Sequence, residues 1–369
     1  MPQKIYTSGE FKKLLFELTA LSSVSGMEQA VVKAMYLKLK GLADEIKIDA
    51  FGNIMATRFG KTDGPAVMIA AHSDEVGGLV RSIDKRGFLR FRLVGVVNPA
   101  ILPSTRVLVK NTIPGTIGSV PGHLAKGEDL VRVKDVDELF IDVGASSDVE
   151  VRSWGISEGS SVTFASPMVE MQNENLVMGK SFDNRVGCAV LIKVFENMKD
   201  KPFAGTLYGV VNVQEEIGMR GAGMTASYLK PDYCIVLDTV ATNDTPNSKD
   251  GMSTLSIGKG PIIQLWEGKA EVFLGTVAHP AVNKLILDSA SKLKIPVQLS
   301  AEYGNWVTDG TAIHKTGTGI PTSIVTVGRR YSHSPNEICD IRDAAECIKL
   351  LTYIIEVANS NFDPRFITL

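Results

Sequence analysis

Three apolar segments of this chain each end in side chains that commonly bind metal ions. The segments, each with the residues that close it, are 66–71 with His72 and Asp74, 205–213 with Glu215 and Glu216, and 233–237 with Asp238. Short, unbroken apolar runs are typical of strands that are covered on both faces. In open α/β sheets, ligands bind at the carboxyl ends of such strands. The pattern therefore predicts a sheet that brings these distant side chains to one crevice.

Helix-like segments alternate with these strands. Further elements are predicted as helices at 185–198, 280–293 and 341–358, the last capped by Asp340, and as strands at 296–301 and 322–327. Strands that alternate with helices imply a sheet between two helical layers. The fold class is therefore expected to be α/β, with a three-layer αβα sandwich as the main domain.

Two local signals describe the N-terminal part. Ser25 and Glu28 form a capping-box pattern before an apolar repeat of helical spacing, which predicts a helix starting there. Residues 46–48 and 54–57 alternate on either side of Phe51-Gly52-Asn53, which is typical of a hairpin.

The segment 77–168 has a different texture from the rest of the chain. It consists of short pieces rich in Val, Ile, Leu and Arg, separated by Gly and Pro, with no sustained helical repeat. We predict a small β-rich, barrel-like domain here, inserted between residues 1–76 and 169–369 of the main domain. Of the ligand-type residues considered, only His123 falls inside it, so it is expected to contribute little to the crevice.

Composition excludes several classes of partner. The net charge of −2 and the absence of a basic tract among aromatic residues argue against a nucleic-acid partner. No apolar run approaches the ~20 residues of a membrane span, and the polar opening residues do not resemble a secretory leader. The four cysteines lie in apolar contexts without a Cys-x-x-Cys pair, so we expect buried thiols and a cytoplasmic location.

The strand-end residues have the chemistry that a pair of divalent cations needs. Such a pair, about 3.5–4 Å apart, requires a bridging carboxylate, further His or carboxylate ligands, and an open position for water. Asp183, after a Gly-Lys turn, and His333, in a polar loop, add to the ligand types already named. In His72-Ser73-Asp74 the two-residue spacing puts both outer side chains on one face, so Asp74 can orient the His72 ring.

Each candidate also has an ordinary structural interpretation. Asp183 would suit a helix N-cap, Glu215-Glu216 a solvated acidic turn, and Asp238 a strand terminator. Glu215 and Glu216 are neighbours, so a regular strand would point them to opposite faces, and both reach the crevice only where the strand ends. The residues taken one at a time do not decide between these interpretations.

Taken together, five motifs resemble a known family in order and separation. They are 71–77, 179–187, 215–222, Asp238-Thr239 with 244–246, and 331–337. Over nearly its whole length the chain resembles the glutamyl aminopeptidase and tetrahedral aminopeptidase family of dinuclear metallopeptidases, some of whose members carry the label endoglucanase M.

The resemblance implies a role for each matching residue. His72 and Asp238 would hold one metal, Glu216 and His333 the other, and Asp183 would bridge the two. Glu215 would be the general base and acid, which must stay unligated, and Asp74 would support His72. The cofactor would be two divalent metal ions per subunit. Carboxylate and imidazole ligands without thiolate suit zinc, which we expect first, or cobalt or manganese.

The resemblance also implies a peptide substrate, with hydrolysis at the N-terminus, and self-association. The inserted segment would be a dimerisation module, and family dimers commonly assemble into dodecamers, so we expect a homo-oligomer. His123 in this segment is considered as a contact to a neighbouring subunit's site. Trp306 replaces a smaller stretch of the family, so the preferred N-terminal residue is not transferred. His314, in an expected helix, is assigned to packing or a hydrogen bond.

Three alternatives stay open at this stage. A glycosidase would use two carboxylates about 5–10 Å apart and needs neither histidine ligands nor metal. A metal-free binding protein on the same fold would be favoured by the loss of a ligand, and none is missing. A related dinuclear deacylase or carboxypeptidase shares the crevice chemistry, although the Glu215-Glu216-Ile217-Gly218 block fits the aminopeptidases better.

Overall fold

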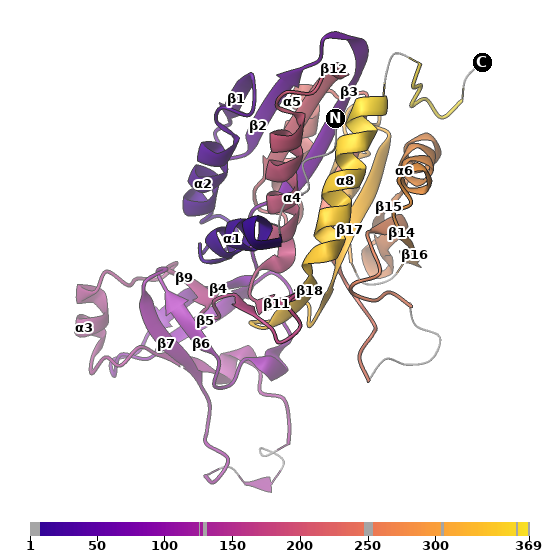
Figure 1. Ribbon diagram of the computed structural model, residues 1–369. Helices are drawn as coiled ribbons and strands as arrows, with labels where there is room; N and C mark the ends of the chain where they lie inside the picture. The colour runs from indigo at the N-terminus through magenta and orange to yellow at the C-terminus, as the bar shows by residue number, and fades with distance from the viewer. Residues whose placement is uncertain are drawn as a thin grey trace.

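The computed structural model describes residues 8–124, 126–127, 131–246, 254–303, 306–358 and 361–367. Two bodies are visible, a large helix-covered sheet and a smaller barrel beside one end of it (Figure 1). The expected α/β fold class is confirmed, with helices on both faces of the sheet and a separate closed barrel.

The large sheet has twelve strands, and its central ones are parallel. The order is β1-β2-β12-β3-β13-β17-β18-β11-β10, with β14 paired to β17 beside this path and β15 and β16 paired to β14. β12, β3, β13 and β17 run parallel to one another, so their carboxyl ends lie at one edge. The strand bounds are β1 Glu45–Ile48, β2 Ile54–Phe59, β3 Thr62–His72, β10 Val169–Glu170, β11 Leu176–Gly179, β12 Ala204–Asn212, β13 Tyr233–Ala241, β14 Ile262–Lys269, β15 Leu274–Val277, β16 Gln298–Tyr303, β17 Thr322–Arg330 and β18 Glu337–Asp340.

Helices cover both faces because the central strands are apolar on both sides. In β3, Val67 and Ile69 pack under α1, α2, α4, α6 and α8, while Met68 and Ala70 face α5 and α7. Figure 1 shows α4 and α8 across the first of these faces. The helix bounds are α1 Ser8–Thr19, α2 Gln29–Leu39, α4 Phe182–Met198, α5 Arg220–Leu229, α6 Pro280–Leu293, α7 Gly310–Ile313 and α8 Ile341–Val357.

The barrel is formed by the segment between β3 and β10. Its strands close in the order β4-β5-β8-β7-β6-β9 around an apolar core of its own. The strand bounds are β4 Gly77–Ile83, β5 Leu89–Val94, β6 Arg106–Val109, β7 Ile113–Gly118, β8 Phe140–Asp142 and β9 Ser161–Phe164, and α3 spans Asp148–Ser153. Short helical turns are η1 Pro99–Ile101 and η3 Val136–Glu138 in this domain and η4 Ala270–Val272 in the main one.

Local signals predicted some elements and misplaced others. The hairpin is confirmed, with Ile46 paired to Ala56, and its turn is closed by Asp49, whose carboxylate accepts three backbone N–H groups. The capping box at Ser25 is wrong. Glu28 occupies the N-cap position of α2, but its side chain makes no capping hydrogen bond there. The Ser25 hydroxyl donates instead to Asp74, 2.6 Å away. A long-range acceptor has taken the place of the local one.

Two other expectations are confirmed by the structure. Asp340 caps α8, because its carboxylate accepts the backbone N–H of Arg342 at 2.9 Å. All four cysteines are free and buried. Within the described residues, no helix combines the length and the apolar character needed to cross a membrane.

Candidate metal centre

The parallel strands bring the predicted side chains level with one another. His72 ends β3, and the neighbouring β12 pairs Asn212 with it. On the other side of β3, Val236 of β13 pairs with Ala70, so Asp238 lies two residues further along and level with His72. The Nε2 atom of His72 is 3.6 Å from Asp238 Oδ1. The strand register thus places an imidazole and a carboxylate side by side.

Asp183 joins two groups of ligand-type side chains. It lies in the first turn of α4, where its peptide bond to Asn184 is cis. Its Oδ1 is 3.1 Å from His72 Nε2, and its Oδ2 is 3.1 Å from His333 Nε2. Two triads with the spacing of a cation site result, His72–Asp183–Asp238 and Asp183–Glu216–His333. Asp183 does not cap the helix, since Ser181 occupies the N-cap position.

Glu215 and Glu216 both approach the site because the chain turns sharply after β12. The strand ends at Asn212, and Gln214 has a left-handed backbone with φ 58°. Asp74 then holds both glutamates through their backbone, accepting the N–H of Glu215 at 2.9 Å and of Glu216 at 3.1 Å. The Glu216 carboxylate is 3.6 Å from His333 Nε2, and that of Glu215 is 4.0 Å from His72 Nε2.

Asp74 is fully buried and surrounded by donors. Its Oδ1 lies 3.3 Å from His72 Nδ1, on the side of the ring opposite to the atom that faces Asp183. Its Oδ2 accepts the Ser25 hydroxyl. A carboxylate beside this ring nitrogen can fix the tautomer and orientation of a metal-binding histidine. The geometry matches what the two-residue spacing predicted for this pair.

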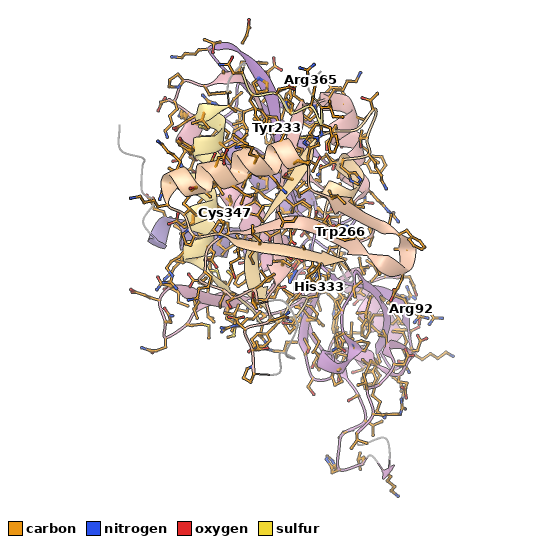
Figure 2. All side chains as sticks on the ribbon, turned by 90° about the vertical axis from the view of Figure 1, so that its right-hand side faces the viewer. Arg92, Tyr233, Trp266, His333, Cys347 and Arg365 are labelled. Carbon is orange, nitrogen blue, oxygen red and sulfur yellow. The ribbon has the colours of Figure 1, made fainter. Side chains whose placement is uncertain are left out.

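His333 is oriented partly by the barrel. Its Nδ1 is 2.7 Å from the backbone oxygen of Val96, in the loop that follows β5. Figure 2 shows His333 close to where the barrel adjoins the sheet domain. A narrow cleft beside it is lined by residues of both, including Phe164 of β9 and Glu337 of β18. The expectation that the insert contributes little to the site is therefore incomplete, because a backbone carbonyl has no sequence signature.

Electrostatics shows how strongly the acidic residues interact. Burial raises the pKa of Glu216 to about 8, with the Asp183 charge adding to the effect and His333 opposing it. Burial alone would lower the pKa of His333, but Glu216 and Asp183 raise it to about 9. Burial also raises the pKa of Glu215 well above its usual value. The site thus carries more negative charge than its histidines neutralise, which favours the uptake of cations or protons.

Sequence reasoning missed a buried guanidinium in this cluster. Arg329 is the penultimate residue of β17 and is 3% exposed. It donates to Asp183 Oδ2, to Glu337 Oε1 at 3.1 Å and to Thr239 Oγ1 at 2.7 Å. The Arg329 charge is the largest of the influences that hold the pKa of Asp183 well below its usual value, against the effect of burial. The sequence motif Gly328-Arg329-Arg330 gave no sign of which arginine turns inward.

Two further buried carboxylates lie near the site, Glu267 on β14 and Asp309 directly before α7. Glu267 accepts the backbone N–H and hydroxyl of Thr308, and burial raises its pKa to about 7. Asp309 accepts the Asn212 amide at 2.8 Å, and burial raises its pKa to about 7 as well. Neither was predicted, because only folding brings these two residues close to the other carboxylates.

The donor set fits divalent cations. Two imidazole nitrogens and several carboxylate oxygens converge in the two triads, a donor set that suits zinc, cobalt or manganese. Glu216 Oε1 is buried and makes no hydrogen bond within the described residues. A cation would satisfy this oxygen, whereas without one it costs free energy.

The remaining candidates lie outside the two triads. His123 is exposed on the barrel, and its contact with another subunit stays a prediction. His314 caps the end of α7, with Nδ1 2.8 Å from the Gly310 oxygen, as expected for a structural histidine. Trp306 packs against a small apolar cluster with Leu255 and Ile262, and its influence on substrate stays a prediction. Gly304 and Asn305, beside it, lie outside the described residues.

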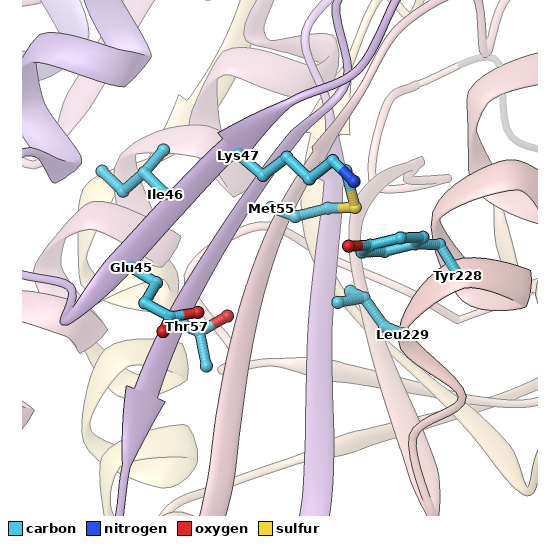
Figure 3. Close-up of a pocket in the computed structure, with 7 residues that line it drawn as sticks. All are labelled: Glu45, Ile46, Lys47, Met55, Thr57, Tyr228 and Leu229. Atoms are coloured by element: carbon cyan, nitrogen blue, oxygen red, sulfur yellow. The ribbon is translucent and has the colours of Figure 1, made fainter.

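A larger pocket lies away from the cluster. It has a volume of about 400 Å³ beside β1, β2 and α5, and Lys47 Nζ lies 3.8 Å from the centre of the Tyr228 ring there (Figure 3). Its lining contains Glu45 but no histidine and no second carboxylate. It therefore lacks a set of donors that could hold a cation.

Comparisons with known proteins agree on one family. A family profile described as M42 glutamyl aminopeptidase matches residues 52–350. A putative aminopeptidase from Acetivibrio thermocellus is 36% identical over 343 residues, covering 93% of this chain and 97% of the relative.

Solved structures of other proteins also resemble this chain. The aminopeptidase APDkam598 from the archaeon Desulfurococcus kamchatkensis superposes with a TM-score of 0.92 at 32% identity, covering 98% of this chain and 99% of that one. The TET1 peptidase of Pyrococcus horikoshii, described as assembling into a tetrahedron or a large octahedral shell, has a TM-score of 0.82 at 26% identity, covering 94% and 99%.

Proposed function

The chain belongs to the M42 glutamyl aminopeptidase family, and on that premise we propose that it removes N-terminal residues from peptides with the help of two bound divalent cations. Membership of a peptidase family makes it a peptide hydrolase rather than a glycosidase. The observation that supports the two-cation proposal best is the pair of triads that share Asp183. One carboxylate with each oxygen directed to a different histidine is suited to bridge two ions.

Each cation would have its own ligands besides the shared carboxylate. His72 and Asp238 would hold one ion, and Glu216 and His333 the other. Asp74 would keep the Nδ1 proton of His72 in place, so that Nε2 presents a lone pair to the ion. When bound, the cations supply Lewis-acid activation of the attacking water and of the scissile carbonyl. Zinc is the first choice, with cobalt and manganese as alternatives.

Glu215 would be the general base and acid. Among the described residues the two triads include Glu216 but not Glu215, although the two side chains are neighbours. The Glu215 carboxylate nevertheless stays close, 4.0 Å from His72 Nε2. A base must be unligated and within reach of the water whose proton it takes. Glu215 would accept that proton and then deliver it to the nitrogen of the leaving amine.

The charge of the site favours the N-terminal end of a peptide. Carboxylates are natural acceptors for an α-ammonium group, and a C-terminal carboxylate would need a free cationic clamp. Arg329 donates from all three of its nitrogens to protein acceptors and is buried, so it does not serve as that clamp. Arg220 lies at the start of α5 and is exposed.

Two neighbouring substitutions test the division of roles. Glu215→Gln should retain both cations and lose roughly 10²- to 10⁴-fold in kcat, the usual contribution of a positioned base. Glu216→Gln should lose about one cation per subunit, measured by elemental analysis after dialysis. Chelation should abolish peptide hydrolysis, and Zn²⁺ or Co²⁺ should restore it. Equal metal loss in the two variants would refute the assignment.

We also propose that the barrel domain, residues 77–168, mediates self-association into a homo-oligomer. A long segment extends from it after β7 (Figure 1), with four exposed apolar side chains, Val120, Leu124, Val131 and Val133. Exposed apolar groups of this kind mark contact surfaces. A double substitution of Val131 and Val133 by Glu should reduce the particle mass in light scattering while leaving the fold intact. An unchanged mass would contradict this role.

The buried free cysteines favour a reducing compartment, and we propose the cytoplasm. Fractionation of the producing cells would test this, and recovery with secreted proteins would contradict it.

A further inference from the structure

Arg329 is a permanent positive charge placed inside the candidate metal centre. Arginine stays protonated at any pH at which proteins fold, so this charge is fixed. The side chain comes from the end of β17 and is almost completely buried. A guanidinium beside a site that would hold cations opposes their binding, because like charges repel strongly where water is excluded.

The guanidinium is held in place from three sides. Its Nε donates to Thr239 of β13, its Nη1 to Glu337 of β18 and its Nη2 to Asp183 of α4. Glu337 is itself anchored, because it accepts the backbone N–H groups of Phe182 at 2.8 Å and His333 at 3.0 Å. Movement of Arg329 would leave Glu337 buried without its counter-charge, which is costly. The guanidinium is therefore expected to stay when cations bind.

The position of Arg329 distinguishes the two halves of the centre. Of the two Asp183 oxygens, Oδ1 faces His72, whereas Oδ2 faces both His333 and the guanidinium. Arg329 thus competes for the one bridging oxygen that the second half requires. Asp238, which belongs only to the first half, forms no ion pair with any Lys or Arg in the part of the chain that the structure describes.

We propose that Arg329 makes the two cation sites unequal, with the Glu216–His333 half the weaker one and filled second. This inference rests on the proposed two-cation function and adds an order of loading to it. Arg329 acts on the ion through Asp183 and through its charge, so it is a positioning residue. A purely structural role, neutralising an acidic cluster, would leave the ratio of the two affinities unchanged.

The first test is the parent protein itself. The metal-free protein is titrated with Co²⁺, with heat and visible absorption as readouts, and the occupancy is checked by elemental analysis. We expect two ions per subunit whose dissociation constants differ by at least about tenfold. Two equal sites would overturn the inference while leaving the proposed function intact. Absence of any Co²⁺ binding would instead contradict the proposed function.

Variants then identify the cause of the inequality. Arg329→Gln removes the charge and should tighten the second site by about tenfold or more, whereas Arg329→Lys keeps the charge and should keep the parent ratio. Arg330→Gln is the matched control, because Arg330 pairs with Asp244 away from the triads and its loss should leave the ratio unchanged. An unchanged ratio in Arg329→Gln, or a Lys variant that behaves like the Gln variant, would overturn the proposal. If Arg329→Gln fails to fold, the parent titration and the Lys variant still test the proposal. Two equal sites in the parent, or a changed ratio in Arg329→Lys, would overturn it.

Discussion

Replacement of Asp74 by asparagine tests whether this buried carboxylate organises the metal centre. Four polar groups surround it, and three of them donate hydrogen bonds to it. Oδ1 faces the Glu215 N–H at 2.9 Å and His72 Nδ1 at 3.3 Å, and Oδ2 faces the Ser25 hydroxyl at 2.6 Å and the Glu216 N–H at 3.1 Å. Asparagine keeps the shape but has one acceptor oxygen and one NH₂ group. Two of the four neighbours must therefore face a donor.

Both orientations of the amide have a cost. With the oxygen at the Oδ1 position, the Ser25 hydroxyl can rotate to accept, but the Glu216 N–H is left buried and unpaired. With the oxygen at the Oδ2 position, the Glu215 N–H is unpaired, and His72 can satisfy the amide only by accepting at Nδ1. That tautomer carries its proton on Nε2, the atom that would bind a cation.

The expected magnitude follows from this count. One buried, unpaired backbone N–H costs about 1–3 kcal/mol, so the free energy of unfolding of the metal-free Asp74→Asn protein should fall by about that amount. Loss of a partner that orients a ligand weakens metal affinity by about 10- to 100-fold, and we expect this at the His72 half.

Denaturant unfolding and Co²⁺ titration measure the two effects separately. Ser25→Ala is the control, because it removes one donor and leaves no N–H group without an acceptor. Stability and affinity of Asp74→Asn both equal to those of Ser25→Ala would refute the reasoning.

Two further predictions concern pH and substrate. The pKa of Glu267 is raised by burial from 4.5 to about 7, so its ionisation costs the folded, metal-free protein about 3 kcal/mol at about 1.4 kcal/mol per pH unit. Because the folded-state pKa is raised, this cost is absent below about pH 4.5 and complete above about pH 7. Glu267→Gln should therefore raise Tm at pH 8 and not at pH 4.5. Equal gains in Tm at both pH values would contradict this. Peptides with a free N-terminus should lose residues stepwise from that end, and N-acetylated ones should not. Product ladders from the C-terminus, or equal cleavage of acetylated peptides, would favour a carboxypeptidase or deacylase instead.

Strand ends were the most informative part of the sequence because their geometry is fixed by local rules. An apolar run closed by a polar residue forms a strand with that residue at its tip, as His72 shows in β3. Asp238 was expected to end its strand as well, but β13 continues to Ala241, so this boundary was wrong. Parallel neighbours must then share an edge. Local patterns also predicted the Asp340 cap and the hairpin around Phe51-Gly52-Asn53. These features need only residues close in sequence.

Local signals failed where a partner distant in sequence was available. Ser25 and Glu28 have a capping-box pattern, yet the Ser25 hydroxyl reaches Asp74, 49 residues away. The sequence also did not indicate which of Arg329 and Arg330 is buried. The first lies among the carboxylates and the second pairs with Asp244 on a more exposed face. Successive side chains of a strand point to opposite faces of the sheet, so one of these two arginines must face inward. Only the packing of the sheet decides which face is the interior.

By itself the sequence determined the kinds of groups that meet and the strands that present them. It determined neither the oxygen of Asp183 that each histidine faces, nor the Val96 carbonyl that orients His333, nor the guanidinium beside them. Those are contacts between elements far apart in the chain, some through backbone atoms that are the same in every residue. Composition and spacing do not encode such contacts individually, because they depend on how the sheet, α4 and the barrel pack together.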